Sequence, residues 1–272
     1  MIIKKIIKYY LEHGIEMFFY KILNKVGFKV KYVNYTQKIK KNLELILLKK
    51  FKNTIQTGCY AGAKIIPKLE WYKYDLNPKL LGTYEIEVQN EIKNLKNKIE
   101  TIIAIGSAEG YHLVGSIKNK LSINGVAFEA NQESLKLLKE NAKKNKVYKK
   151  INYFGNADKN FLKKIPNTIK LNKTLFLIDV EGSEYMLLSD KNLKKIKNSF
   201  LIIEIHTSTA KKLIKLKRNI NKYFYFREFN SSLKNRSLEN IKFINKFSDD
   251  ERLLMLSEGR NYNMSWIIAT PK

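Results

Sequence analysis

From Glu100 onward, short apolar segments alternate with lysine-rich segments whose apolar residues recur at helical spacing. The apolar segments are residues 102–105, 125–128, 151–154, 175–180 and 200–205, and two more lie near residues 223–229 and 264–270. Short, continuously apolar strands separated by helices indicate a parallel sheet that is covered on both faces. The pattern therefore predicts an α/β fold with a seven-stranded, mostly parallel sheet and helices on both faces.

The segment between the second and third predicted strands shows the helical pattern in detail. Asn131 can cap the N-terminus of a helix, and Leu135, Leu138 and Ala142 form one apolar stripe along it. Lysines crowd the last turn, where the helix dipole favours positive charge. We expect a surface helix with one buried face over this segment.

Residues 1–70 differ from the rest of the chain because they contain lysine-rich amphipathic segments without the strand pattern. We interpret them as a basic, helical N-terminal extension to a catalytic domain of residues 71–272. No charge-free apolar run reaches the roughly 18 residues that a membrane-spanning helix needs, so we predict no transmembrane segment. Cys59 is the only cysteine, which excludes an internal disulfide and a cysteine zinc site and favours a cytoplasmic location.

The formal net charge of +27 raises the question of nucleic-acid binding, because dense positive charge attracts polyanions. Nearly all of this charge is lysine, which is spread along the chain together with abundant asparagine and isoleucine, as an AT-rich genome would encode. Arginine, the residue expected at bidentate phosphate sites, occurs only at Arg218, Arg227, Arg236, Arg252 and Arg260. The composition favours a solvated lysine surface over a dedicated nucleic-acid-binding face.

The segment "TIIAIGSAEGYHLVGS", residues 101–116, is an apolar run that continues into a glycine loop and then a helical pattern. Gly106 and Gly110 are separated by Ser107, Ala108 and Glu109, which departs from the G-x-G-x-x-G spacing of dinucleotide-binding loops. The glycines allow a tight turn and a close approach of the backbone to a ligand beside a helix N-terminus.

The loop resembles that of class I S-adenosylmethionine-dependent methyltransferases, and the segments "VAFEANQESLKLL" and "YFGNAD" strengthen the resemblance. The pair "FLIDVEGSEYMLL" and "FLIIEIH" is similar to the signature of FkbM-type methyltransferases. The resemblance covers residues 82–205 and implies a Rossmann-like fold that binds S-adenosylmethionine. The cofactor-binding residues that it implies are Glu85, Gly106, Ser107, Ala108, Glu109, Gly110, Glu129, Ala130, Asn156, Ala157 and Asp158.

Individual residues have expected roles within this set. Glu129 has two acceptor oxygens that suit the two ribose hydroxyls, and Asp158 can accept a hydrogen bond from the adenine amino group. The family usually has an acidic residue where this chain has Ala104, and that acid helps to hold the ammonium group of the cofactor. Glu109 can replace it or can be a solvent-exposed or helix-capping carboxylate, and the sequence leaves both open.

Four residues at the ends of the fourth and fifth predicted strands form the candidate catalytic cluster: Asp179, Glu181, Glu204 and His206. Neighbouring parallel strands bring such residues to one edge of the sheet, where open α/β folds bind ligands. The cluster suits a general base or, through Asp179, Glu204 and His206, a magnesium or manganese ion. In the loop before the last strand, Arg260 is a candidate for binding an anionic or polar substrate group or an ordinary surface arginine.

Three functions are compatible with these residues. The first is an O-methyltransferase for a hydroxyl of a sugar, a glycan or a related small metabolite, where the glycan preference comes only from the FkbM resemblance. The second is an RNA methyltransferase that uses the basic surface and the aromatic residues Tyr9, Tyr10, Phe18, Phe19 and Tyr20. The third is a binding protein that kept the fold without catalysis. The sequence does not determine the oligomeric state.

Overall fold

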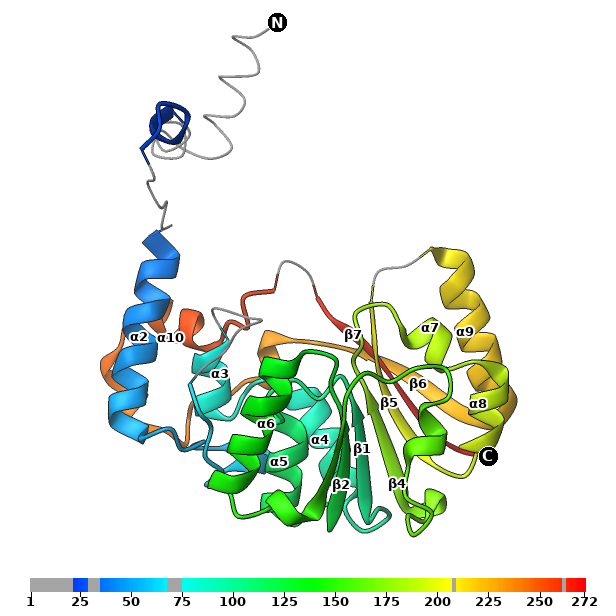
Figure 1. Ribbon diagram of the computed structural model, residues 1–272. Coiled ribbons are helices and arrows are strands. Elements are labelled where there is room, and N and C mark those ends of the chain that lie inside the picture. The colour runs from blue at the N-terminus through cyan, green and yellow to red at the C-terminus, as the bar shows by residue number, and fades with distance from the viewer. Residues whose placement is uncertain (1–21, 29–34, 68–74, 207–208, 261–262) are drawn as a thin grey trace, which may run out of the picture. The chain divides into compact units, whose positions relative to one another are not determined.

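The computed structural model describes residues 22–28, 35–67, 75–206, 209–260 and 263–272 (Figure 1). The N-terminal aromatic residues considered for RNA stacking lie outside these ranges. The chain divides into two compact units, Met1–Asn42 and Leu43–Lys272. The larger unit contains the sheet and every residue of the candidate site.

Seven strands form one sheet in the order β3-β2-β1-β4-β5-β7-β6. Their bounds are β1 Thr101–Ile105, β2 Asn124–Phe128, β3 Ile151–Phe154, β4 Thr174–Ile178, β5 Phe200–Ile205, β6 Phe224–Asn230 and β7 Ser265–Pro271. The first five run parallel, and β7 pairs antiparallel with both β5 and β6. The predicted α/β fold is confirmed, and so is the seven-stranded, mostly parallel, Rossmann-like sheet.

The helices in chain order are α2 Tyr35–Phe51, α3 Leu76–Leu81, α4 Ile86–Leu95, α5 Tyr111–Lys118, α6 Gln132–Lys144, α7 Glu184–Leu187, α8 Asp190–Lys195, α9 Ala210–Tyr223 and α10 Asp249–Leu256. Before β1, α3 ends at Gly82, whose φ of 87° gives a left-handed cap. In α6 the Asn131 side chain accepts a hydrogen bond from Ser134 N at 2.9 Å, which confirms the predicted cap.

The central strands β1 and β4 are almost entirely apolar and buried, as expected where helices cover both faces of a sheet (Figure 1). On one face, alternate residues such as Ile103 and Ile105 of β1 belong to a core cluster with Leu187, Leu193 and Ile220 from α7, α8 and α9. On the other face α5 approaches β2 so closely that a side chain on Gly125 would meet Leu113 and Ile117.

The larger unit begins at Leu43, whereas the sequence analysis placed the domain boundary at residue 70. The reason is a strap of residues 53–66, which packs into this unit instead of extending from it. Tyr60 is fully buried, and its ring occupies the space that Gly115 of α5 leaves open. Asn141 and Asn145 of α6 accept hydrogen bonds from the backbone of Ile66 and Lys64 at 2.9 and 2.8 Å.

The structure bears on the predicted lack of a transmembrane segment only for the residues that it describes. Within those residues, no helix has both the length and the apolar character that crossing a membrane requires.

Candidate active site

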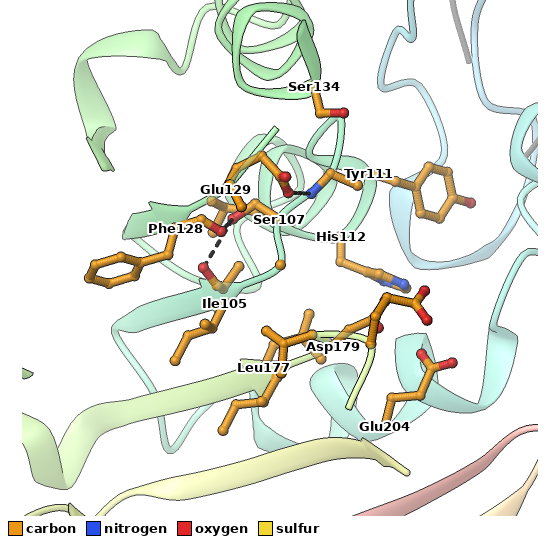
Figure 2. Close-up of a pocket in the computed structure, with 18 of the residues that line it drawn as sticks. Ile105, Ser107, Tyr111, His112, Phe128, Glu129, Ser134, Leu177, Asp179 and Glu204 are labelled. Atoms are coloured by element: carbon orange, nitrogen blue, oxygen red, sulfur yellow. Dashed lines mark hydrogen bonds between the residues drawn. The ribbon is translucent and has the colours of Figure 1, made fainter. Parts of the chain in front are cut away.

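A cavity of about 500 Å³ opens at the carboxyl ends of β1, β2, β4 and β5 (Figure 2). Twelve of the predicted site residues line it: Glu85, Gly106, Ser107, Ala108, Glu109, Glu129, Ala130, Asn156, Ala157, Asp179, Glu181 and Glu204. The other four, Gly110, Asp158, His206 and Arg260, do not. Figure 2 shows Ser107 and Glu129 toward one end of the cavity, and His112, Asp179 and Glu204 toward the other. The volume lies in the range of small-molecule and cofactor sites.

The glycine loop is held by its own backbone contacts. Gly106 has a φ of 79°, and a Cβ on it would overlap the carbonyl oxygen of Asp179. The N–H groups of Gly106 and Ser107 donate to Phe128 O at 2.9 and 3.1 Å. Gly110 also has a positive φ, but a Cβ there would meet Leu138 of α6. Gly110 therefore serves helix packing, while Gly106 lets the loop lie against the end of β4.

Glu129 joins the end of β2 to the glycine loop. Its Oε2 accepts a hydrogen bond from Ala108 N at 2.7 Å, and its Oε1 accepts one from Asn131 N at 2.8 Å (Figure 2). Ala108 has a φ of 44°, an unusual conformation for a residue with a side chain. Each carboxylate oxygen keeps a second lone pair, so Glu129 can brace the loop and still accept hydrogen bonds from a ligand.

Asp158 lies away from the cavity lining, in contrast to the expected contact with adenine. Its carboxylate is exposed, accepts a hydrogen bond from Asn160 N at 2.6 Å and lies 3.3 Å from Lys164 Nζ. The neighbouring Asn156 and Ala157 do line the cavity. The structure thus brings the loop after β3 to the cavity without the Asp158 side chain, whose role stays a prediction.

Glu109 is buried, which removes the alternative of a solvent-exposed carboxylate. Its Oε1 lies 2.7 Å from Nζ of Lys79, a residue of α3 that the sequence analysis missed. Ala104 is 3% exposed and brings no charge to the wall. Lys79 was missed because the contact joins residues 30 positions apart and no local pattern marks it.

A chain of polar contacts connects Tyr60 to the cavity. Tyr60 Oη lies 3.0 Å from His112 Nδ1, and His112 Nε2 lies 2.8 Å from Glu85 Oε2. Glu85 also pairs with the Arg260 guanidinium. Burial would raise the pKa of Glu85, but Arg260 and His112 hold it well below its ordinary value. His112 therefore both lines the cavity and connects Tyr60 to Glu85.

Arg260 is not an ordinary surface arginine, because its side chain is only 14% exposed. Besides Glu85, its guanidinium pairs with Glu204 Oε1 at 3.1 Å and with Glu258 Oε2 at 2.9 Å. It does not line the cavity. In the structure, Arg260 therefore pairs with three carboxylates. Binding of substrate by Arg260 stays a prediction.

The predicted catalytic cluster converges on His206. Its Nε2 lies 3.4 Å from Asp179 Oδ1, 3.4 Å from Glu181 Oε2 and 3.9 Å from Glu204 Oε1. Behind the ring, Glu184 is fully buried, with its Oε1 3.5 Å from Nδ1 and 3.2 Å from the backbone N of His206. Asp179 and Glu181 keep 45% and 65% of their side-chain surface exposed, so they are the open members of the cluster.

Burial and neighbouring charges shift the pKa values of the residues in this cluster. Burial, with the negative charges of Glu85 and Glu181, raises the pKa of Asp179 to about 8. Burial, with the charges of Asp179 and Glu85, raises the pKa of Glu204 to about 9 although Arg260 opposes the shift. Burial would lower the pKa of His206, but Glu184 and Glu204 raise it. Such shifts are typical of functional sites.

The donor atoms of Asp179, Glu181 and His206 lie within 4.8 Å of one another, which is close enough for one metal ion. The sequence analysis named Glu204 in place of Glu181. Glu204 is instead held by Arg260, whereas Glu181 is turned toward His206 from a left-handed backbone conformation with a φ of 48°.

No protein-family model matches this sequence, and no curated protein matches it either. Solved structures with a similar arrangement include a precorrin-6y C5,15-methyltransferase from Geobacter metallireducens, with 13% identity, 77% of this chain and 94% of that chain covered, and a TM-score of 0.48. An O-methyltransferase from Bacillus cereus, solved with S-adenosylhomocysteine, has 11% identity, covers 93% and 97%, and has a TM-score of 0.46. TrmK from M. capricolum, also solved with S-adenosylhomocysteine, has 17% identity, covers 67% of each chain and has a TM-score of 0.43.

Proposed function

We propose that this protein is an S-adenosylmethionine-dependent O-methyltransferase that acts on a hydroxyl of a sugar, a glycan or a related small metabolite. The observation that carries the proposal is the cavity itself. One wall contains the glycine loop braced by Glu129, and the opposite end contains the open carboxylate of Asp179. A cofactor site and a proton acceptor therefore share one cavity of about 500 Å³.

The residues of the cofactor wall fit S-adenosylmethionine. Glu129 retains acceptor capacity for the ribose hydroxyls, and the small residues Gly106, Ala108 and Ala130 let a ligand approach the backbone. When bound, the cofactor supplies an electrophilic methyl group on a sulfonium sulfur, and the electron pair of the broken C–S bond stays on that sulfur.

Asp179 is the proposed general base. It lines the cavity, and a pKa raised above its ordinary value makes its ionised carboxylate a stronger base toward a hydroxyl proton. The acceptor oxygen forms its bond to the methyl carbon as this proton moves to Asp179. His206, with Nε2 3.4 Å from Asp179, stabilises the ionised carboxylate, and Glu184 holds the imidazole from behind.

The same cluster fits a divalent ion. Asp179 and Glu181 offer carboxylate oxygens and His206 offers a ring nitrogen, a donor set that suits magnesium or manganese. A bound ion would lower the pKa of the acceptor hydroxyl. The general-base mechanism and the metal-assisted mechanism use the same residues. Only the general-base mechanism should keep its activity when a chelator removes divalent ions.

The carboxyl groups at the open end of the cavity favour a neutral acceptor over a polynucleotide. Asp179 is 45% and Glu181 65% exposed there, and Glu85 and Glu204 lie behind them. A phosphate group needs cationic partners that these four carboxyl groups do not supply, whereas a sugar hydroxyl can donate a hydrogen bond to them. The overall charge of +27 therefore does not translate into an attractive site for RNA.

The test is calorimetric titration with S-adenosylmethionine and S-adenosylhomocysteine, with NAD as the control ligand. We expect micromolar binding of the first two, lost in Glu129→Ala and kept in Glu133→Ala, a surface change in the next helix. Methyl transfer is then measured on sugars and on RNA, with and without chelator. If the folded protein binds neither ligand, the proposed methyltransferase function is wrong, and the non-catalytic binding protein remains as the alternative. Salt-dependent methylation of RNA alone would overturn the small-acceptor assignment.

A further inference from the structure

Lys79 is a buried charged residue in the wall of the cavity. It is 4% exposed, and its Nζ lies 2.7 Å from Glu109 Oε1 and 2.8 Å from Asp75 Oδ2. Burial alone would lower the pKa of Lys79, but the two carboxylates raise it well above its ordinary value. Lys79 therefore remains an ammonium group inside the protein.

This ammonium is fixed from several sides. Its Nζ lies 4.6 Å from the centre of the Tyr84 ring and 5.9 Å from that of Tyr111. Lys79 and Glu109 line the cavity, whereas Asp75, which is 1% exposed, does not. The cavity thus meets an ion pair, Lys79 with Glu109, and Asp75 supplies a second negative charge outside the lining.

An ion pair in a cavity wall is complementary to a ligand that carries both charges on neighbouring atoms. The amino-acid end of S-adenosylmethionine is such a zwitterion, with an ammonium and a carboxylate on one carbon. Ala104 brings no charge to this ammonium, whereas Glu109 brings a carboxylate to the lining of the same cavity. Glu109 follows Ala108, whose N–H donates to Glu129, so the loop that contains Glu109 is bound directly to the proposed ribose contact.

We propose that Lys79 and Glu109 bind the amino-acid end of the cofactor, Lys79 through its carboxylate and Glu109 through its ammonium. This assignment rests on the proposed function. Asp75 is a positioning residue that keeps Lys79 charged and in place. The pair replaces the acidic residue that is missing at Ala104, and its lysine comes from α3, outside the segments that carry the sequence resemblance.

The experiment compares S-adenosylhomocysteine with 5′-methylthioadenosine, which has the same adenosine and thioether but lacks the amino-acid group. Both are titrated calorimetrically into the full chain and into Lys79→Met, Glu109→Gln and Glu129→Ala. Lys173→Met is the control, because Lys173 forms a similar 2.6 Å pair with Glu100 on the surface. Thermal unfolding of each variant checks that it is folded.

We expect Lys79→Met and Glu109→Gln to weaken S-adenosylhomocysteine by about 10- to 100-fold, the value of one charged hydrogen bond, and to leave 5′-methylthioadenosine unchanged. Glu129→Ala should weaken both ligands, and Lys173→Met neither. If Lys79→Met does not fold, the nearly isosteric Glu109→Gln decides the matter by the same comparison.

Two results would overturn the assignment alone: equal losses for both ligands in the Lys79 and Glu109 variants, or unchanged affinity for S-adenosylhomocysteine. Equal losses would mean that the pair only braces the loop. A folded wild-type protein that binds neither ligand would instead overturn the proposed function, and this assignment with it.

Discussion

The carbonyl oxygen of Asp179 lies where a side chain on Gly106 would have to be. The glycine loop after β1 and the end of β4 are therefore packed backbone against backbone. The cofactor wall and the proposed base are fixed relative to each other by this contact, without any side chain between them. Proximity of this kind is what alignment of two reactants requires.

Gly106→Ala should be severely destabilising, because the added methyl group overlaps a backbone atom and φ is already 79°. We expect a loss of more than about 3 kcal/mol in the free energy of unfolding. Two controls separate the causes. Gly62→Ala has a φ of 82° but open space, and should cost about 1–2 kcal/mol. Gly155 has neither a left-handed φ nor a neighbour that a side chain would meet, so Gly155→Ala should leave the free energy of unfolding nearly unchanged. If urea unfolding shows similar losses of unfolding free energy for Gly62→Ala and Gly106→Ala, the overlap with Asp179 has little energetic cost, which would contradict the prediction.

Arg260→Met should destabilise the protein by about 3–5 kcal/mol, because it leaves Glu85, Glu204 and Glu258 without their shared cation. Arg260→Lys should recover only part of this loss, since one ammonium cannot reach three carboxylates as a guanidinium does. The matched control is Arg227→Met, an exposed partner of Glu91, with an expected change below about 1 kcal/mol. Equal unfolding energies for the Arg260 and Arg227 variants would contradict the buried network.

Glu204 should make the protein less stable as the pH rises. Its pKa is about 9 in the folded protein and near 4.5 in the unfolded chain, so between these values the folded state binds more protons. The free energy of unfolding then falls with increasing pH across this window. Glu204→Gln, whose amide oxygen still accepts from Arg260, should flatten the dependence and be relatively more stable at pH 8 than at pH 5.

Denaturant unfolding from pH 5 to 9 measures this effect, and Glu228→Gln, on the surface beside Lys217, is the control. His206, whose folded pKa is also raised, contributes a loss of stability in the same direction, so the wild-type slope should not disappear entirely in the variant. A Glu204→Gln profile parallel to the wild type would show that Glu204 is ionised throughout the range.

The central strands were predictable from the sequence because they are short, continuously apolar segments separated from one another by helical patterns. The expected residues 151–154 and 200–205 coincide with β3 and β5. The fourth strand ends at Ile178, two residues before the predicted end, because its polar continuation at Asp179 turns toward the cavity. The carboxylates at the ends of β4 and β5 were predictable by the same logic, since parallel strands end at one edge.

Other parts of the site were not predictable, since they depend on contacts between distant segments. Lys79 of α3 reaches Glu109 across 30 residues, and Arg260 meets Glu85 across 175 residues. Asp158 was expected in the cavity from its place after β3, but the local turn directs its carboxylate to Asn160 and Lys164. Side-chain direction after a strand is set by such turns, which sequence patterns do not resolve.

The strap of residues 53–66 also determines how short the protein can be made. Cutting at residue 70, where the composition changes, would remove Tyr60 and expose the groove beside Gly115 that its ring fills. It would also remove Tyr60 as a hydrogen-bond partner of His112. Asn141 and Asn145 would lose the backbone N–H groups from which they accept hydrogen bonds. A shortened chain that keeps the larger unit intact therefore has to start at or before Leu43, with the strap included.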